Sequence, residues 1–167
     1  MTTRNPFDNL PTAIIPGNYG PSFKHGNYLV EVTLLLLKMS KNPKTLNKYF
    51  VSFEAVILQQ YEGCFADSNE VGQKVSKVFM IEAAGWEGQY AMGNVKALVA
   101  AILNIDAELI TVDHCMSMTG STNTPTGFVP GDGTAAANMQ VVIAVTDSDK
   151  SDDKGNVYTN LAFFPAV

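Results

Sequence analysis

The chain has 167 residues, of which 46% are hydrophobic and 16% charged, and its formal net charge is -5. This length is typical of one compact domain, and the apolar content excludes a disordered polymer. No apolar run approaches the roughly twenty residues of a membrane helix, and the N-terminus lacks a basic-then-apolar signal pattern. We therefore expect one domain in a reducing cytoplasm, neither spanning a membrane nor secreted, with Cys64 and Cys115 as free thiols.

The charge is unevenly distributed along the chain. Residues 1–60 contain six basic residues against three acidic ones, whereas residues 61–167 contain five lysines against thirteen acidic residues. Four of the acidic residues gather at Asp147, Asp149, Asp152 and Asp153. Any basic binding surface is therefore expected to be local and to lie in the first third of the chain.

The first elements in chain order are an extended arm and a hairpin. Four prolines spaced along residues 1–25 disfavour helix and central strand, so we expect a Pro-rich arm before a folded domain of residues 26–167. Alternation from Gly26 predicts a strand whose buried face holds Tyr28, Val30, Val32, Leu34 and Leu36. Asn42-Pro43 supplies turn chemistry before a second strand at residues 49–58. That strand is predicted to point Val51, Phe53, Ala55 and Ile57 inward and Phe50, Ser52 and Glu54 outward.

The rest of the chain predicts further strands around one main helix. Residues 71–81 alternate as a third strand, and residues 89–103 follow helical spacing with a stop at Asn104. A short helix is expected within 106–116, and the Gly- and Thr-rich residues 119–138 predict a long surface loop. Residues 139–146 and 157–164 predict the last two strands, separated by an acidic turn.

This order of elements, three strands, a helix and two strands, is that of the OB-fold, a five-stranded Greek-key barrel. A β-sandwich or an SH3-like barrel with an inserted helix would give a similar order. We expect a mainly β domain with one main helix and favour the OB-fold because of the position of the helix.

Residues that could form a catalytic or metal site are sparse. The chain has only two histidines, and Asp113-His114-Cys115 is its densest local set, but adjacent residues do not by themselves form a triad. The glycines between Gly127 and Gly133 lack the lysine of a phosphate-binding loop. His25, beside Lys24, is interpreted as solvated or as contacting phosphate. We therefore expect no enzyme, no metal and no cofactor.

Single-strand nucleic-acid binding needs a basic groove and aromatic rings on which bases stack. The lysine candidates are Lys38, Lys41, Lys44 and Lys48 around the first hairpin loop and Lys74 and Lys77 on the third strand. In an OB barrel these lysines are expected to line one continuous face. The aromatic candidates are Tyr49, Phe50, Phe79, Trp86 and Tyr158, of which Phe50 is the strongest. The alternatives are a solvated hairpin tip for the lysines, sheet packing for Tyr49, Phe50 and Phe79, and barrel capping for Trp86.

Several segments together resemble a family of bacteriophage OB-fold single-stranded-DNA-binding proteins. They are Gly26-Asn-Tyr-Leu-Val-Glu-Val, Lys48-Tyr-Phe-Val-Ser-Phe-Glu-Ala-Val, Val71-Gly-Gln-Lys-Val-Ser, Gly93-Asn-Val-Lys-Ala-Leu-Val-Ala-Ala-Ile, and Lys154-Gly-Asn-Val-Tyr with Phe164-Pro165. The resemblance covers residues 26–165 with gaps. It implies a protein of the host cytoplasm that coats single strands during phage replication or recombination, without strong sequence preference.

Two features depart from this family, and other functions stay open. Related replication proteins often end in an acidic tail that recruits partners, whereas this chain ends Asn-Leu-Ala-Phe-Phe-Pro-Ala-Val. The net charge is also negative, so any DNA groove is expected to be local and its binding to weaken steeply with salt. The partners that the resemblance implies are single-stranded DNA, replication or recombination proteins, and further copies of the chain. The alternatives are a phage structural or assembly protein that docks through the arm and the long loop, and an acidic DNA mimic that inhibits a host protein.

Overall fold

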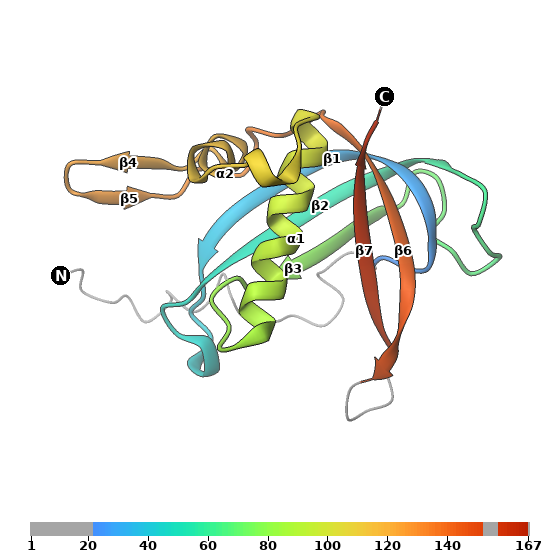
Figure 1. Cartoon of the computed structure of the whole chain (residues 1–167), viewed down its shortest axis with the longest axis horizontal. Helices are drawn as coiled ribbons and strands as arrows, with labels where there is room; N and C mark the ends of the chain where they lie inside the picture. The colour runs from blue at the N-terminus through green and yellow to red at the C-terminus, as the bar shows by residue number, and fades with distance from the viewer. Residues whose placement is uncertain (1–21, 152–156, 167) are drawn as a thin grey trace.

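The computed structural model describes residues 22–151 and 157–166, without the side chains of residues 45, 148–151, 157 and 158 (Figure 1). Its main element is a five-stranded antiparallel sheet in the order β3-β2-β1-β6-β7. These strands are β1 (Gly26–Met39), β2 (Tyr49–Gln60), β3 (Lys74–Phe79), β6 (Gln140–Ser151) and β7 (Val157–Pro165). The other elements are helices α1 (Trp86–Leu103) and α2 (Val112–Thr119) and a separate hairpin of β4 (Thr122–Thr124) and β5 (Gly127–Val129). The predicted mainly β class is confirmed.

The strand order is that of a Greek key. β1, β2 and β3 pair in sequence, and β6 returns after the helices to pair with the other side of β1. β3 and β7 are the two edges of the sheet and do not pair with each other in the described residues, so the sheet is not closed into the predicted barrel. Instead α1 contacts both edge strands and connects them across the inner face (Figure 1).

The core lies between the inner face of the sheet and α1. Val51, Phe53, Ala55 and Ile57 are buried, as the alternation of β2 predicts. They share one apolar cluster with Val95, Leu98 and Val99 of α1. We call the opposite side of β1, β2 and β3 the outer face. It carries the even-numbered residues of β2, namely Phe50, Ser52, Glu54 and Val56, together with their cross-strand neighbours.

The buried face of β1 was predicted correctly only in its first half. Tyr28, Val30 and Val32 are fully buried, but the pairing with β2 shifts between Val32 and Leu34. This β-bulge inserts one residue, so Leu35 points into the core. The predicted core positions Leu34 and Leu36 therefore lie on the outer face, opposite Glu54 and Ser52.

The helices begin and end close to the predicted positions. α1 starts at Trp86, three residues before the predicted start, and ends where Asn104 adopts a left-handed conformation with φ 54°. An added Cβ at Gly88 would overlap the carbonyl oxygen of Ala83, so this glycine allows the first turn of α1 to pack on the preceding loop. The predicted short helix is α2 and is preceded by a single 3-10 turn at Ala107–Leu109.

The predicted loop of residues 119–138 contains structure of its own. Its first part forms the β4–β5 hairpin, which projects from the body of the molecule beyond α2 (Figure 1). Its last part lies along β1, where the backbone N–H of Leu35 donates to the carbonyl oxygen of Gly133 at 2.9 Å. The N–H of Val32 likewise donates to the carbonyl oxygen of Met139 at 2.7 Å. These bonds extend the hydrogen bonding of β1 to residues that precede the start of β6.

The end of the predicted arm packs against the sheet. Phe23 is 2% exposed, and its ring stacks on Phe53 with a centroid distance of 5.9 Å. Ser22 forms a parallel bridge with Ser76 of β3. Residues 1–21 of the arm lie outside the described residues.

Candidate functional site

Lys38 and Phe50 lie directly opposite each other where β1 and β2 meet the first hairpin loop. Both belong to the outer face, and both side chains are half-buried. Directly paired residues on one face of an antiparallel sheet have Cβ atoms about 4.5–5.5 Å apart. The outward direction predicted for Phe50 is thus confirmed, and the pairing places a cation beside an aromatic ring.

Three further candidate lysines lie in or next to the loop that joins these two strands. Lys44 lies in a 3-10 turn at Pro43–Thr45, and its N–H donates to the side chain of Asn42 at 3.0 Å. Lys41 and Lys48 flank the turn, and the Lys48 carbonyl oxygen accepts from the N–H of Ser40 at 2.7 Å. Among the described residues none of Lys38, Lys41, Lys44 and Lys48 forms an ion pair. The nearby carboxylate of Glu82 accepts from the N–H of Tyr49 at 2.8 Å.

Tyr49 is separated from this face by the alternation of β2. It pairs with Met39 on the side of the inward-facing residues. Its ring meets that of Phe128 on β5 edge to face, at a centroid distance of 5.6 Å and an angle of 85°. The contact joins the β4–β5 hairpin to the strand that carries Phe50.

The two predicted lysines of β3 do not share a face. Lys74 is on the outer face, where its Nζ lies 3.4 Å from Oε2 of Glu54. Lys77 is three residues further along, and in a strand that spacing reverses the direction of the side chain. It pairs with Phe53 on the inner face, where partial burial lowers the pKa of its ammonium group. The prediction that both lysines line one continuous surface is wrong.

Of the remaining aromatic candidates, Phe79 is part of the core. Its side chain is 2% exposed, and it lies opposite Val51. Trp86 begins α1 and is 67% exposed, so it does not cap the core. Tyr158 belongs to β7, but its side chain is outside the described part of the chain.

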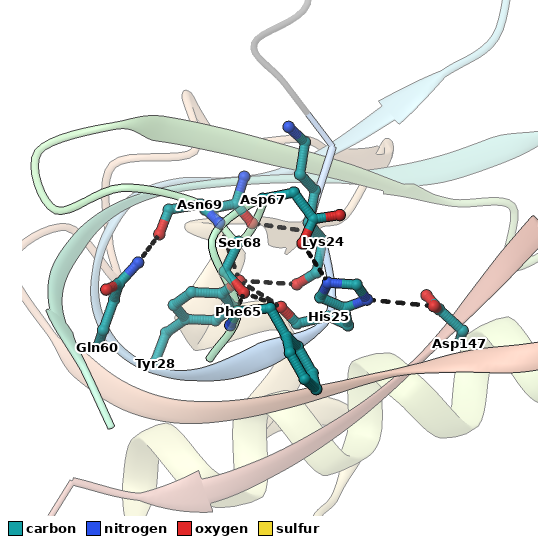
Figure 2. A network of polar contacts seen from close by, with 9 residues as sticks. All are labelled: Lys24, His25, Tyr28, Gln60, Phe65, Asp67, Ser68, Asn69 and Asp147. Atoms are coloured by element: carbon teal, nitrogen blue, oxygen red, sulfur yellow. Dashed lines mark hydrogen bonds and ion pairs between the residues drawn. The ribbon is translucent and has the colours of Figure 1, made fainter. Parts of the chain in front are cut away.

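A second polar site surrounds His25, just before β1. Its Nε2 lies 2.7 Å from Oδ1 of Asp67, and its Nδ1 lies 3.2 Å from Oδ2 of Asp147 (Figure 2). The hydrogen bonds to these two carboxylates raise the pKa of His25 above its ordinary value of 6.5. The hydrogen bond from His25 lowers the pKa of Asp67. The Phe65 ring meets the imidazole edge to face at 4.7 Å.

The backbone that carries His25 is held by a buried hydrogen-bond network. The hydroxyl of Tyr28 lies 2.9 Å from the carbonyl oxygens of both Lys24 and His25 and accepts from the N–H of Asn69 at 3.0 Å. Ser68 donates to the same His25 carbonyl at 2.6 Å. Tyr28, Ser68 and Asn69 are all buried, so the network fixes the residues before β1 against the loop that follows β2 (Figure 2).

A cleft of about 470 Å³ opens beside this histidine. It is lined by His25, Gly26, Asn27, Gly63, Phe65, Asp67, Val145, Thr146 and Asp147. Phe65 is 64% exposed, so the wall combines an accessible aromatic ring with two carboxylates. A second cleft of about 480 Å³ runs along α1 between Ile81 and Lys96.

Sequence reasoning missed the His25 site. His25 and Asp147 are 122 residues apart, and no spacing rule brings them together. The only available signal was the strand order, because antiparallel pairing of β1 with β6 brings the residues before β1 near the end of β6. Asp147 was predicted as part of an acidic turn, whereas β6 continues to Ser151.

The Asp113-His114-Cys115 set has a structural role on α2. The hydroxyl of Thr111 accepts from the N–H of His114 at 3.3 Å, and Nδ1 of His114 accepts from the N–H of Thr111 at 3.0 Å. These reciprocal bonds form a capping box at the helix start. Burial raises the pKa of the Cys115 thiol, which packs against the core.

Within the described residues, no group of three or more His, Cys, Asp or Glu side chains is arranged to hold a metal ion. No helix in that same part of the chain is long and apolar enough to cross a membrane. No protein-family model matches the chain, and no curated protein matches it.

Proposed function

We propose that this protein binds single-stranded DNA on the outer face of β1 and β2, without strong sequence preference. The observation that carries the proposal is the cross-strand pair of Lys38 and Phe50 beside the loop that holds three further lysines. Binding of single strands without sequence preference needs cations along the phosphates and exposed rings for the bases. This end of the sheet brings the half-buried ring of Phe50 together with Lys38 and the three lysines in and beside the connecting loop.

The strand order supports an OB-type scaffold for this function. An OB-fold is a five-stranded, partly open Greek-key barrel whose second and third strands face the nucleic acid. In this protein β2 and β3 are adjacent, β6 completes the Greek key, and α1 connects the two sheet edges. We propose that the sheet is an OB-fold left open between β3 and β7.

The proposed site is smaller than the set of residues predicted from the sequence. It consists of Lys38 and Phe50 at its centre, with Lys41, Lys44 and Lys48 around the loop. Lys74 lies further along the outer face and interacts with Glu54, so its contribution to phosphate binding is expected to be weaker. Lys77 and Phe79 are left out because both belong to the inner side of β3.

The hairpin β4–β5 contacts β2 beside Phe50 in the chain but on the opposite face. Phe128 contacts Tyr49, and Tyr49 precedes Phe50 in the chain. Residues 120–131 carry no charged side chain, so the hairpin adds no repulsion towards phosphates. Because Tyr49 and Phe50 point to opposite faces of β2, the hairpin contact lies on the other side of the strand from Phe50, and the hairpin is not part of the proposed site.

The experiment is fluorescence anisotropy of a labelled oligo(dT) titrated with the protein at several salt concentrations. Wild-type protein is expected to bind at low salt and to weaken steeply as salt rises, because lysine contacts release counterions. Phe50→Ala is expected to lose about 1–3 kcal/mol, the usual contribution of one stacked base. Tyr90→Ala, which removes a 61% exposed ring on α1, is the matched control and is expected to bind as wild type. Absence of binding at low salt would contradict the proposal.

A second candidate function is assembly, and the projecting hairpin favours it. In the described residues β4 and β5 pair only with each other, so the outer edge of each strand is available for pairing. An isolated two-stranded hairpin is marginally stable, and docking on another chain would stabilise it. Light scattering of wild-type protein and a variant lacking residues 122–129 separates the two functions. Assembly that needs the hairpin, without affinity for DNA, would favour the second.

A further inference from the structure

The imidazole of His25 bridges two segments that are distant in the chain. Asp67 lies in the loop that joins β2 to β3, and Asp147 lies on β6 where the regular pairing with β7 becomes irregular. One ring nitrogen faces a carboxylate oxygen of each residue, at 2.7 Å and 3.2 Å. His25 therefore joins the loop to the last residues of β6 through its side chain alone.

The geometry selects one protonation state of this ring. A carboxylate that is ionised can only accept hydrogen bonds, and a neutral imidazole carries a single N–H. A neutral His25 could satisfy one carboxylate and would turn an unprotonated nitrogen, an acceptor, towards the other. Only the imidazolium form can donate to both aspartates at once, and both nitrogen–oxygen distances are within hydrogen-bonding range.

We propose that His25 is a pH-sensitive latch, which in its protonated form holds the β2–β3 loop to the end of β6 and on deprotonation releases one of the two. Its two carboxylates line the same cleft as His25. The charge of the three groups together changes from one negative charge to two when the imidazole loses its proton. Release thus makes the cleft wall more acidic as well as less constrained.

Other described groups around the latch do not offset this change. Lys24 acts on Asp67 through its charge and helps to keep that carboxylate ionised. The hydroxyl of Tyr28 bonds the backbone of His25 and, because burial raises its pKa, stays protonated through the range in which a histidine titrates. Ser68 also holds the backbone and does not titrate. The main chain at residue 25 therefore stays in place while the two side-chain contacts respond to pH.

The raised pKa of His25 places the transition above the ordinary value of 6.5. Such a shift moves a histidine towards neutral pH, where small changes in acidity alter its charge. The latch is independent of the proposed DNA site, since neither Lys38 nor Phe50 takes part in it.

The first test is an NMR titration of the histidine Cε1–H resonances in the full chain. The chain has two histidines, so His25→Gln assigns both signals. We expect His25 to titrate above 6.5 in the wild type and at a lower pH in both Asp67→Asn and Asp147→Asn. A titration at or below 6.5, or one that neither substitution lowers, would overturn the latch.

The second test is hydrogen exchange of the β2–β3 loop amides at about pH 5.5 and about pH 8.5, corrected for intrinsic rates. Above the transition the loop is expected to exchange about two- to fivefold faster in the wild type, a range set by typical exposed ion pairs. His25→Gln, which cannot carry the charge, is expected to show equal corrected rates at both pH values. His114→Gln is the control and is expected to keep the wild-type difference. Equal corrected rates in the wild type would show that protonation of His25 holds nothing in place.

Discussion

The two ends of β1 carry charge in contrasting ways. At the Met39 end, Lys38 on the outer face and the lysines in and beside the adjoining loop have no ion-pair partner among the described residues. At the Gly26 end, His25 contacts two carboxylates, and its backbone carbonyl accepts hydrogen bonds from the buried side chains of Tyr28 and Ser68. Charges without an internal partner favour an external polyanion, whereas charges that are paired internally stabilise the fold and make it depend on pH.

The largest expected effect comes from the core beneath β2. Phe53→Ala removes a fully buried ring that stacks on Phe23, and we expect it to lower the free energy of unfolding by about 3–5 kcal/mol. Urea denaturation measures the change. A loss under about 1 kcal/mol would contradict the assigned core.

The second-largest effect on the free energy of unfolding is expected from removing the buried hydroxyl of Tyr28, near His25. Tyr28→Phe leaves the ring in place and removes the oxygen that accepts from Asn69 and bonds the Lys24 and His25 carbonyls. We expect a loss of about 1–3 kcal/mol, the cost of buried polar groups left without a partner. Phe50→Ala, at the other end, should change the free energy of unfolding by no more than about 1 kcal/mol. Similar losses of unfolding free energy in the two variants would contradict the proposed difference between the two ends of β1.

Charge reversal at the Met39 end of β1 should weaken DNA binding. Lys38→Glu is expected to weaken oligo(dT) binding about tenfold and to reduce the slope of log affinity against log salt by about 0.7, the value for one phosphate contact on a single strand. Lys96→Glu reverses an exposed charge on α1 and is the matched control. The measurement is anisotropy across a salt series. An equal effect of both variants would indicate a response to net charge alone.

The pH dependence of stability should come from the Gly26 end of β1, where His25 contacts its two carboxylates. The pKa of His25 is raised in the folded state, so its contribution is complete below 6.5 and is lost as pH rises through the folded value. The pKa of Asp67 is lowered, so its contribution is present above 3.8 and is lost as pH falls through the folded value. The stabilisation of wild type over His25→Gln is therefore expected to be largest between these limits and to shrink towards pH 8, which urea denaturation at each pH measures. A stabilisation that grows from pH 6 to pH 8 would contradict the assignment.

The smallest effect is expected at Lys77. Lys77→Met keeps the aliphatic stem against the inner face and removes an ammonium group whose pKa is lowered by burial. The free energy of unfolding should change by less than about 1 kcal/mol, and DNA binding should stay the same. Weaker DNA binding by this variant would show that Lys77 contacts DNA and would contradict its assignment to the inner side of β3.

The parts of the fold that could be predicted from the sequence are those that neighbouring residues encode. The inner residues of β2 and the stop of α1 at Asn104 were predicted because alternation and a left-handed cap are encoded by neighbouring residues. The β1 bulge was missed because Leu34–Leu37 are all apolar, so the sequence does not mark the residue at which the buried face changes.

The candidate site could likewise be predicted only where it depends on neighbouring residues. The outward direction of Phe50 follows from its own strand, but its pairing with Lys38 depends on the register that the bulge and the loop length set. Lys74 and Lys77 were placed together although their spacing separates them, an error that strand alternation alone would have prevented. The contact of His25 with Asp147 required knowledge that β6 pairs with β1.

The most direct test of the central claim is ultraviolet crosslinking of oligo(dT) to the wild-type protein, with the modified peptides identified by mass spectrometry. Binding at the Lys38–Phe50 pair predicts crosslinks in the peptides that contain Tyr49 and Phe50, reduced by added salt. Crosslinks confined to Phe65 at the His25 cleft or to Trp86 and Tyr90 on α1, or none at low salt, would contradict the account.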